Sequence, residues 1–200
     1  MAIEYAVAGL GNPGDRYRNT RHNLGFRVVE AIAAARRGEW SPAGRKRRTA
    51  VVRLAGSSVL LVEPLTYMNL SGDALAAILA EENLPPGRLL VVCDDIALPR
   101  GQLRLRKSGS DGGHNGLKSV IERLGTTGFP RLRMGVGPVP PRVDAAEFVL
   151  AEFLPEEEAD VSAMIDGAAA CAESWVREGI DRAMNRFNAR PGPAEGEGEP

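Results

Sequence analysis

Apolar residues along the chain follow two spacings, which predict strands and helices in alternation. Short runs without polar interruption, at residues 5–10 and 89–93, are typical of strands that are covered on both faces. Apolar positions spaced three and four residues apart predict a helix over residues 24–37. The same two patterns predict further strands at 50–54, 58–63, 102–106 and 131–136, and helices at 71–83, 114–124, 156–177 and 179–188. Strands that alternate with helices indicate a single α/β domain over residues 1–188.

Two segments fall outside this alternation. Residues 143–150 receive no assignment from either pattern. Residues 189–200 consist mainly of Pro, Gly and Glu. Such a segment buries too little apolar surface to offset the entropy of ordering the chain, so a disordered tail is predicted there.

Composition narrows the class of protein. The chain has 200 residues, of which 44% are hydrophobic and 26% charged, as in ordinary globular domains. No run approaches the roughly 18 apolar residues of a membrane span, and the first residues lack the regions of a secretory signal. Cys93 and Cys171 are too few and too far apart for a disulfide framework. We therefore expect a cytoplasmic protein without a membrane partner.

The net charge of −1 conceals an uneven distribution. Residues 1–140 carry a net charge of +8, and residues 141–200 carry −9. A basic body suggests a polyanionic partner, although charges on a solvated surface would give the same count. The basic run at residues 45–48 is interpreted as a solvated loop in preference to a phosphate contact.

Residues 9–14 match the Gly-x-Gly-x-x-Gly pattern of dinucleotide-binding loops and directly follow a predicted strand. In that motif the helix begins at once, so that its N-terminus faces the pyrophosphate. Here Pro13 and residues 14–21 precede the predicted helix, and the next strand does not end in the expected acidic residue. A dinucleotide partner, and with it an oxidoreductase function, is therefore not favoured.

Polar loops at residues 12–23, 64–72, 94–101 and 107–116 carry the candidate chemistry. His22 is the candidate general base, and Asp94 at the end of a predicted strand is the candidate carboxylate that orients it. No Gly-x-Ser-x-Gly nucleophile motif is present, so this pair points to activation of water. His22 could instead be a surface residue and Asp94 could cap a turn. Zinc bound by His22, Cys93 and His114 is not favoured, because the sequence offers no close ligand pair.

Three stretches stand out as motifs: residues 9–23 with Tyr17 and the sequence Thr-Arg-His-Asn, residues 64–72 (Pro-Leu-Thr-Tyr-Met-Asn-Leu-Ser-Gly), and residues 112–117 (Gly-Gly-His-Asn-Gly-Leu). Together they resemble the motifs of bacterial peptidyl-tRNA hydrolase. The resemblance runs from about residue 3 to residue 188. It implies a twisted, mixed, mostly parallel sheet surrounded by helices, in a monomer without metal or cofactor. The implied activity is hydrolysis of the ester between a peptide and the 3′ terminal ribose of tRNA.

The resemblance also implies roles for individual residues. His22 would be the general base and Asp94 its orienting partner, while Asn12 would help select N-blocked substrates. Substrate contacts are implied for Tyr17, Tyr67, Asn69, Asn115 and His114, and contacts to acceptor-stem phosphates for Arg104, Arg106 and Arg133. Cys93 and Ala97 depart from the residues common in the family, without changing an implied catalytic position. A non-catalytic RNA-binding protein on the same scaffold remains the alternative.

Overall fold

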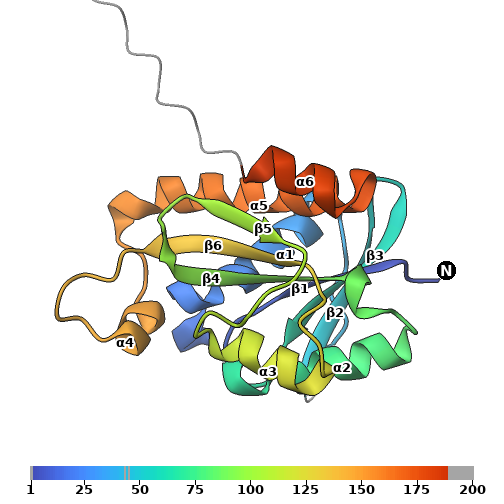
Figure 1. The fold of residues 1–200 in the computed structure, drawn as a ribbon, viewed down its shortest axis with the longest axis horizontal. Helices are drawn as coiled ribbons and strands as arrows, with labels where there is room; N and C mark the ends of the chain where they lie inside the picture. Colours follow the sequence, from blue (N-terminus) through green and yellow to red (C-terminus); the bar gives the residue numbers. More distant parts are fainter. Residues whose placement is uncertain (1, 43, 45, 189–200) are drawn as a thin grey trace, which may run out of the picture.

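The computed structural model describes residues 2–42, 44 and 46–188, so the predicted disordered tail lies outside the described residues. The described chain forms one six-stranded sheet with helices on both faces (Figure 1). Its strands are β1 (Tyr5–Gly9), β2 (Arg47–Leu54), β3 (Ser57–Pro64), β4 (Leu89–Pro99), β5 (Leu103–Arg106) and β6 (Arg131–Gly137). Its α-helices are α1 (Leu24–Ala35), α2 (Ser71–Glu81), α3 (Asn115–Leu124), α4 (Ala145–Leu150), α5 (Glu158–Glu178) and α6 (Ile180–Phe187).

The strand order is β2-β3-β1-β4-β6-β5. The four inner strands are mutually parallel, while β2 and β5 run antiparallel to their neighbours at the two edges. This confirms the predicted mixed, mostly parallel sheet. None of the described helices is long and apolar enough to pass through a bilayer.

Three inner strands, β1, β3 and β4, place alternate side chains in two separate cores, whereas β6 contributes to only one of them. Val7 of β1 packs with α1 and α5 on one face, whereas Ala6 and Ala8 pack with α2 and α3 on the other. All three are fully buried. Burial on both faces explains why the sequences of these three strands lack polar alternation.

Two glycines bring the start of α1 against the end of β1. A Cβ at Gly9 would collide with the carbonyl group of Gly25, and a Cβ at Gly25 would collide with the backbone of Leu10 and Val92. Only glycine permits this backbone approach. It holds the segment that precedes α1, with His22, beside the carboxyl ends of the central strands.

Helix α1 begins at Leu24, after the short 3₁₀ helices Asp15–Tyr17 and Arg21–Asn23. The glycine-rich turn at residues 9–14 therefore does not lead directly into a helix. This agrees with the reasoning that disfavoured a dinucleotide site.

The structure corrects the predicted end of β4. The strand was expected to end at Asp94, but it continues to Pro99, with a shift in its pairing to β6 between Asp95 and Pro99. Polar residues did not stop the strand, because β6 continues to supply partners for its backbone groups.

The basic run at residues 45–48 is also corrected, except for Arg45, which lies outside the described residues. Arg47 and Arg48 belong to β2, not to a solvated loop. Arg48 forms ion pairs with Glu63 and Glu30, and Arg47 forms one with Glu81. These contacts within the protein engage the two guanidinium groups.

Candidate active site

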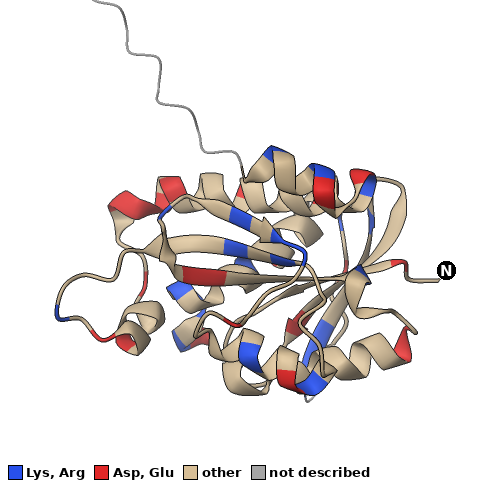
Figure 2. Ribbon diagram, in the orientation of Figure 1, with Lys and Arg blue, Asp and Glu red and all other residues tan. Residues whose placement is uncertain are grey.

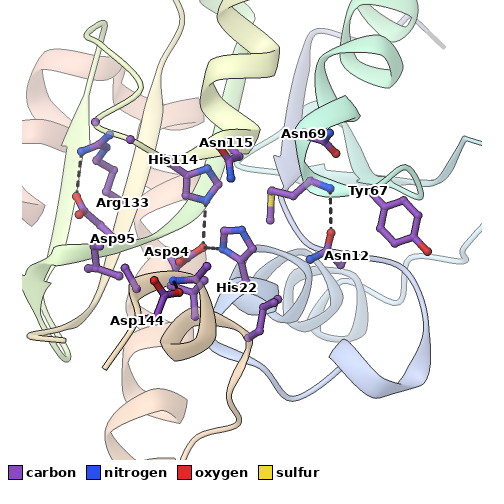
Figure 3. Close-up of a pocket in the computed structure, with 18 residues that line it drawn as sticks. Asn12, His22, Tyr67, Asn69, Asp94, Asp95, His114, Asn115, Arg133 and Asp144 are labelled. Atoms are coloured by element: carbon purple, nitrogen blue, oxygen red, sulfur yellow. Dashed lines mark hydrogen bonds and ion pairs between the residues drawn. The ribbon is translucent and has the colours of Figure 1, made fainter. Parts of the chain in front are cut away.

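A cavity of about 830 Å³ opens where the carboxyl ends of β1 and β4 meet the segment that precedes α1 and the start of α3 (Figure 3). Helix α4 closes one side of it. The polar side chains that line the cavity are Asn12, His22, Tyr67, Asn69, Asp94, Asp95, His114, Asn115, Arg133 and Asp144. Among the described residues of the lining there is no Ser or Cys to serve as a nucleophile.

His22 and Asp94 form the predicted pair. Nδ1 of His22 lies 2.8 Å from Oδ1 of Asp94, and both residues are buried. An ionised carboxylate can only accept, so Nδ1 of His22 donates the hydrogen bond and Nε2 keeps its lone pair. His22 can therefore accept a proton at Nε2 on the cavity side.

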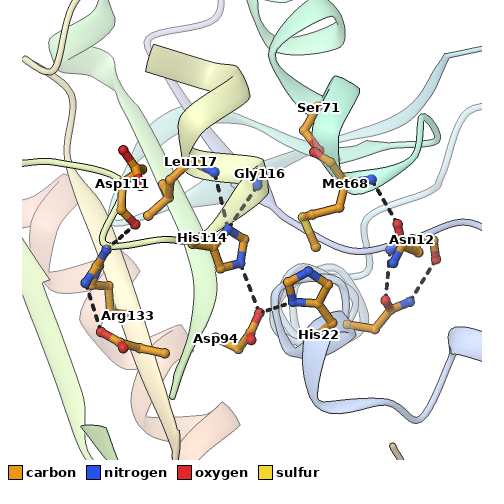
Figure 4. A network of polar contacts seen from close by, with 12 residues as sticks. Asn12, His22, Met68, Ser71, Asp94, Asp111, His114, Gly116, Leu117 and Arg133 are labelled. Carbon is orange, nitrogen blue, oxygen red and sulfur yellow. Dashed lines mark hydrogen bonds and ion pairs between the residues drawn. The ribbon is translucent and has the colours of Figure 1, made fainter. Parts of the chain in front are cut away.

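Asp94 has a second histidine partner, which the sequence did not reveal. Nε2 of His114 lies 3.1 Å from the same Oδ1, and the two imidazole rings are 4.9 Å apart between centroids (Figure 4). Burial opposes ionisation of Asp94, but the facing rings of His22 and His114 outweigh it and hold the pKa of this carboxyl below its ordinary value. Asp94 is therefore an anion at neutral pH.

Asn12 is fixed so that its amide nitrogen is left for a ligand. Its Oδ1 accepts a hydrogen bond from the backbone N–H of Met68 at 2.9 Å. Its backbone is held by Asn23, which accepts from the Asn12 N–H at 2.8 Å and donates to the Asn12 carbonyl at 2.9 Å. Because the carbonyl oxygen of the side chain is engaged, Nδ2 is the group that Asn12 offers to the cavity.

The other predicted substrate residues divide into two groups. Tyr67, Asn69, His114 and Asn115 line the same cavity as His22. Tyr17 is outside the described lining, on the 3₁₀ helix Asp15–Tyr17, with the guanidinium of Arg16 4.5 Å from its ring centroid. The implied substrate contact of Tyr17 therefore stays a prediction.

The three predicted phosphate contacts differ in their surroundings. Arg104 and Arg133 face each other across β5 and β6, and Arg106 follows on β5, so these strands form a basic strip (Figure 2). Arg133 donates to Asp95 at 3.0 Å and to the Asp111 carbonyl at 2.6 Å. Arg133 is thus engaged within the protein, whereas Arg104 and Arg106 make no side-chain ion pair in the described part of the chain.

Three lining residues could in principle hold a metal ion. His22, Asp94 and His114 each offer one ligand atom, all within 4.8 Å of one another. Cys93, which the zinc hypothesis would have used, is instead fully buried in the core. A metal ion bound to His22, Asp94 and His114 would have to displace the two hydrogen bonds that the histidine rings make to Oδ1 of Asp94.

Sequence reasoning missed the wall that α4 forms. Arg21 lies between the rings of Phe148 and Phe153, at 4.5 and 4.8 Å, and its guanidinium donates to Glu157 at 2.7 Å. The same guanidinium donates to the Glu152 carbonyl at 2.7 Å. Since Arg21 directly precedes His22, these contacts tie α4 to the candidate base. The one signal of this contact in the sequence is the position of Arg21, a basic residue, next to His22.

Fold and site together define a class. A buried histidine–carboxylate pair with side-chain amides beside it, at the carboxyl ends of the strands of an α/β sheet, is an arrangement that suits hydrolases in which a base activates water. The family model for peptidyl-tRNA hydrolase matches residues 6–195. The chain belongs to the peptidyl-tRNA hydrolase family.

Individual relatives agree along nearly the whole chain. The peptidyl-tRNA hydrolase of Chloroflexus aggregans is 48% identical over 185 residues, which cover 92% of this chain and 98% of the relative. That of a Roseiflexus strain is also 48% identical, over 94% of this chain and 87% of its own. The crystal structure of peptidyl-tRNA hydrolase from Acinetobacter baumannii superposes with a TM-score of 0.87 at 30% identity, covering 94% of this chain and 97% of that one.

Proposed function

We propose that this cavity hydrolyses the ester of peptidyl-tRNA, with His22 as the general base. The observation that carries the proposal is the buried hydrogen bond between His22 and Asp94, which leaves Nε2 of His22 unprotonated at the cavity. The chain's family supports the substrate, since its members are hydrolases of peptidyl-tRNA.

The chemistry begins with a water molecule between His22 and the ester carbonyl. Nε2 of His22 takes a proton from this water as it attacks, and Asp94 stabilises the imidazolium that forms. The tetrahedral oxyanion needs hydrogen-bond donors, and Nδ2 of Asn12 is one that the surrounding contacts leave available. The side-chain amide of Asn115 lines the same cavity and is a second candidate donor. His22 then returns its proton to the ribose oxygen that leaves.

The RNA is expected to approach over the basic strip of β5 and β6. Arg104 and Arg106 would contact acceptor-stem phosphates, which hold RNA without reading its sequence. Arg133, engaged by Asp95, would support this surface more than it would clamp a phosphate. We expect the enzyme to act as a monomer in the cytoplasm, with Tyr67 and Asn69 contacting the substrate in the cavity that they line.

The proposal is tested with an N-acetylated aminoacyl-tRNA, by measuring the release of free tRNA. His22→Ala removes the base, so we expect kcat to fall by about 10² to 10⁴ while tRNA binding is kept. The exposed Arg36 directly follows the C-terminal end of α1, the end away from His22, and supplies a control, Arg36→Gln, that should hydrolyse at the wild-type rate. Wild-type turnover by His22→Ala would refute the role, and tRNA binding without turnover by the wild-type chain would favour an RNA-binding protein.

A further inference from the structure

His114 makes hydrogen bonds at both ring nitrogens, and they fix the position of its proton. It is the N-cap of α3, and its Nδ1 accepts hydrogen bonds from the backbone N–H groups of Gly116 at 3.1 Å and Leu117 at 3.2 Å (Figure 4). A nitrogen that accepts in this way holds a lone pair and no proton. The ring proton is therefore on Nε2, which lies 3.1 Å from Oδ1 of Asp94.

His22 has the opposite arrangement. It donates from Nδ1 to the same oxygen of Asp94 and keeps its lone pair on Nε2. We infer that the two histidines hold opposite tautomers, and that His114 is a positioning residue for Asp94 that stays neutral while His22 gains and loses its proton. The inference rests on the proposed function only in its second part, because the tautomers follow from hydrogen bonds of the free protein.

Helix α3 is what keeps His114 neutral. A proton on Nδ1 would break both capping hydrogen bonds and leave two N–H groups at the helix start without their acceptor. It would also place a positive charge at a helix N-terminus, where the helix dipole is unfavourable to cations. The side chain of His114 is only 7% exposed, so water gives little compensation. The neighbouring ring of His22, 4.9 Å away, would add repulsion during turnover.

The other charged groups of the cavity are engaged elsewhere. Asp95 is paired with Arg133 at 3.0 Å. Asp144 caps α4 by accepting from two backbone N–H groups at its start. Asp94 is therefore the carboxylate, among the described residues, that hydrogen-bonds both rings. Its Oδ1 accepts two hydrogen bonds, and the one from His114 moderates how strongly Asp94 attracts the proton of His22.

This role differs from substrate binding in its consequences. A hydrogen-bond donor that weakens the attraction of Asp94 for the proton of His22 keeps His22 unprotonated down to a lower pH. His22 is then able to act as a base over a wider range. A residue that only contacts substrate changes KM and leaves the pH dependence of the free enzyme alone.

The tautomers can be read directly in the full-length protein. The chain contains two histidines, so ¹⁵N-labelled imidazole gives two ring patterns in a long-range proton–nitrogen spectrum. We expect one ring protonated at Nδ1 and the other at Nε2, with the Nε2–H ring unchanged between about pH 8 and about pH 5. A second proton on that ring within this range, or the same tautomer on both rings, would overturn the inference. Since no hydrolysis is measured, this result is independent of the proposed function.

His114→Asn tests the positioning role. Asn is among the best N-caps, so it keeps the hydrogen bonds to the start of α3, but its shorter side chain withdraws the donor from Asp94. We expect the acid limb of the kcat/KM profile to move to higher pH by about 0.3 unit or more, while KM stays near the wild-type value. His114→Ala, which removes the cap as well, should show the same movement together with a lower melting temperature. An acid limb that stays in place in His114→Asn would overturn the positioning role, whether or not KM rises.

Discussion

Replacing Asp94 by Asn tests the electrostatic part of the mechanism without changing the shape of the side chain. Asp94 is 2% exposed, and its Oδ1 lies 2.8 Å from Nδ1 of His22. The amide oxygen of Asn can still accept this hydrogen bond. What disappears is the negative charge that, in the proposed mechanism, stabilises His22 once it has taken a proton from water.

The structure allows the size of this effect to be worked out. The centre of the imidazolium charge would lie about 4 Å from the carboxylate, and with an effective dielectric constant of about 20 the attraction is about 4 kcal/mol. Each 1.36 kcal/mol changes a rate tenfold at about 25 °C, so kcat should fall by about 10³ in Asp94→Asn. Substrate affinity should change little, because no charge develops on His22 in the ground state.

The measurement is single-turnover release of tRNA from an N-acetylated aminoacyl-tRNA, with enzyme in excess. Asp144→Asn is the matched control, since Asp144 lines the same cavity and caps α4, a duty that Asn performs equally well. We expect the control to remain within about threefold of wild type. A loss below about tenfold in Asp94→Asn, or equal losses in both variants, would show that the charge beside His22 does not carry the reaction.

Three further outcomes are expected. Gly25→Ala should lower the free energy of unfolding by about 3 kcal/mol in urea titrations, because the added Cβ meets strand backbone, whereas Gly87→Ala, with nothing within 4 Å, should change it by about 0.5 kcal/mol at most. The folded protein holds the pKa of Asp94 below its unfolded value, so Asp94 contributes stability above about pH 4 that is lost as the pH falls further. In Asp94→Asn the free energy of unfolding should therefore depend less steeply on pH in acid. An unchanged dependence would contradict this. Arg104→Gln should reduce the slope of log affinity for tRNA against log salt by about 0.7 to 0.9, and an unchanged slope would remove this residue from the phosphate surface.

The sequence predicted the buried parts of β1, β3 and β4 well, because burial on both faces requires a continuous apolar run in each of them. It did not predict α4, whose six residues are too few to form a helix by propensity alone. That helix depends on Asp144 at its start and on Arg21, which is distant in the sequence but donates to the backbone just beyond it. Contacts of this kind leave no periodic pattern.

The residue types of the candidate site could be predicted from the sequence, but most of the contacts between these residues could not. The Asn and His residues of the polar loops indicated where the chemistry lies, and the motif resemblance indicated the family. The imidazole rings of His22 and His114 both contact Oδ1 of Asp94. This shared contact depends on where β4 meets α3, so it appears only in the folded chain. The pairing of Arg133 with Asp95 likewise arises from the register of β4 against β6, and it engages the guanidinium for which the resemblance implies a phosphate contact.

The proposed base, His22, and the proposed amide donor, Asn12, are positioned by one local structure, whereas Asp94 is positioned by another. Asn23 holds the backbone of Asn12 by two hydrogen bonds and directly follows His22, so the donor and the base are fixed to each other near the start of α1. Asp94 is held by the central sheet. A displacement of the α1 start would therefore carry the base and the donor together and open the gap to Asp94. The close glycine contact between β1 and α1 keeps the two parts together, so backbone packing remote from the substrate contributes to the geometry on which the proposed reaction depends.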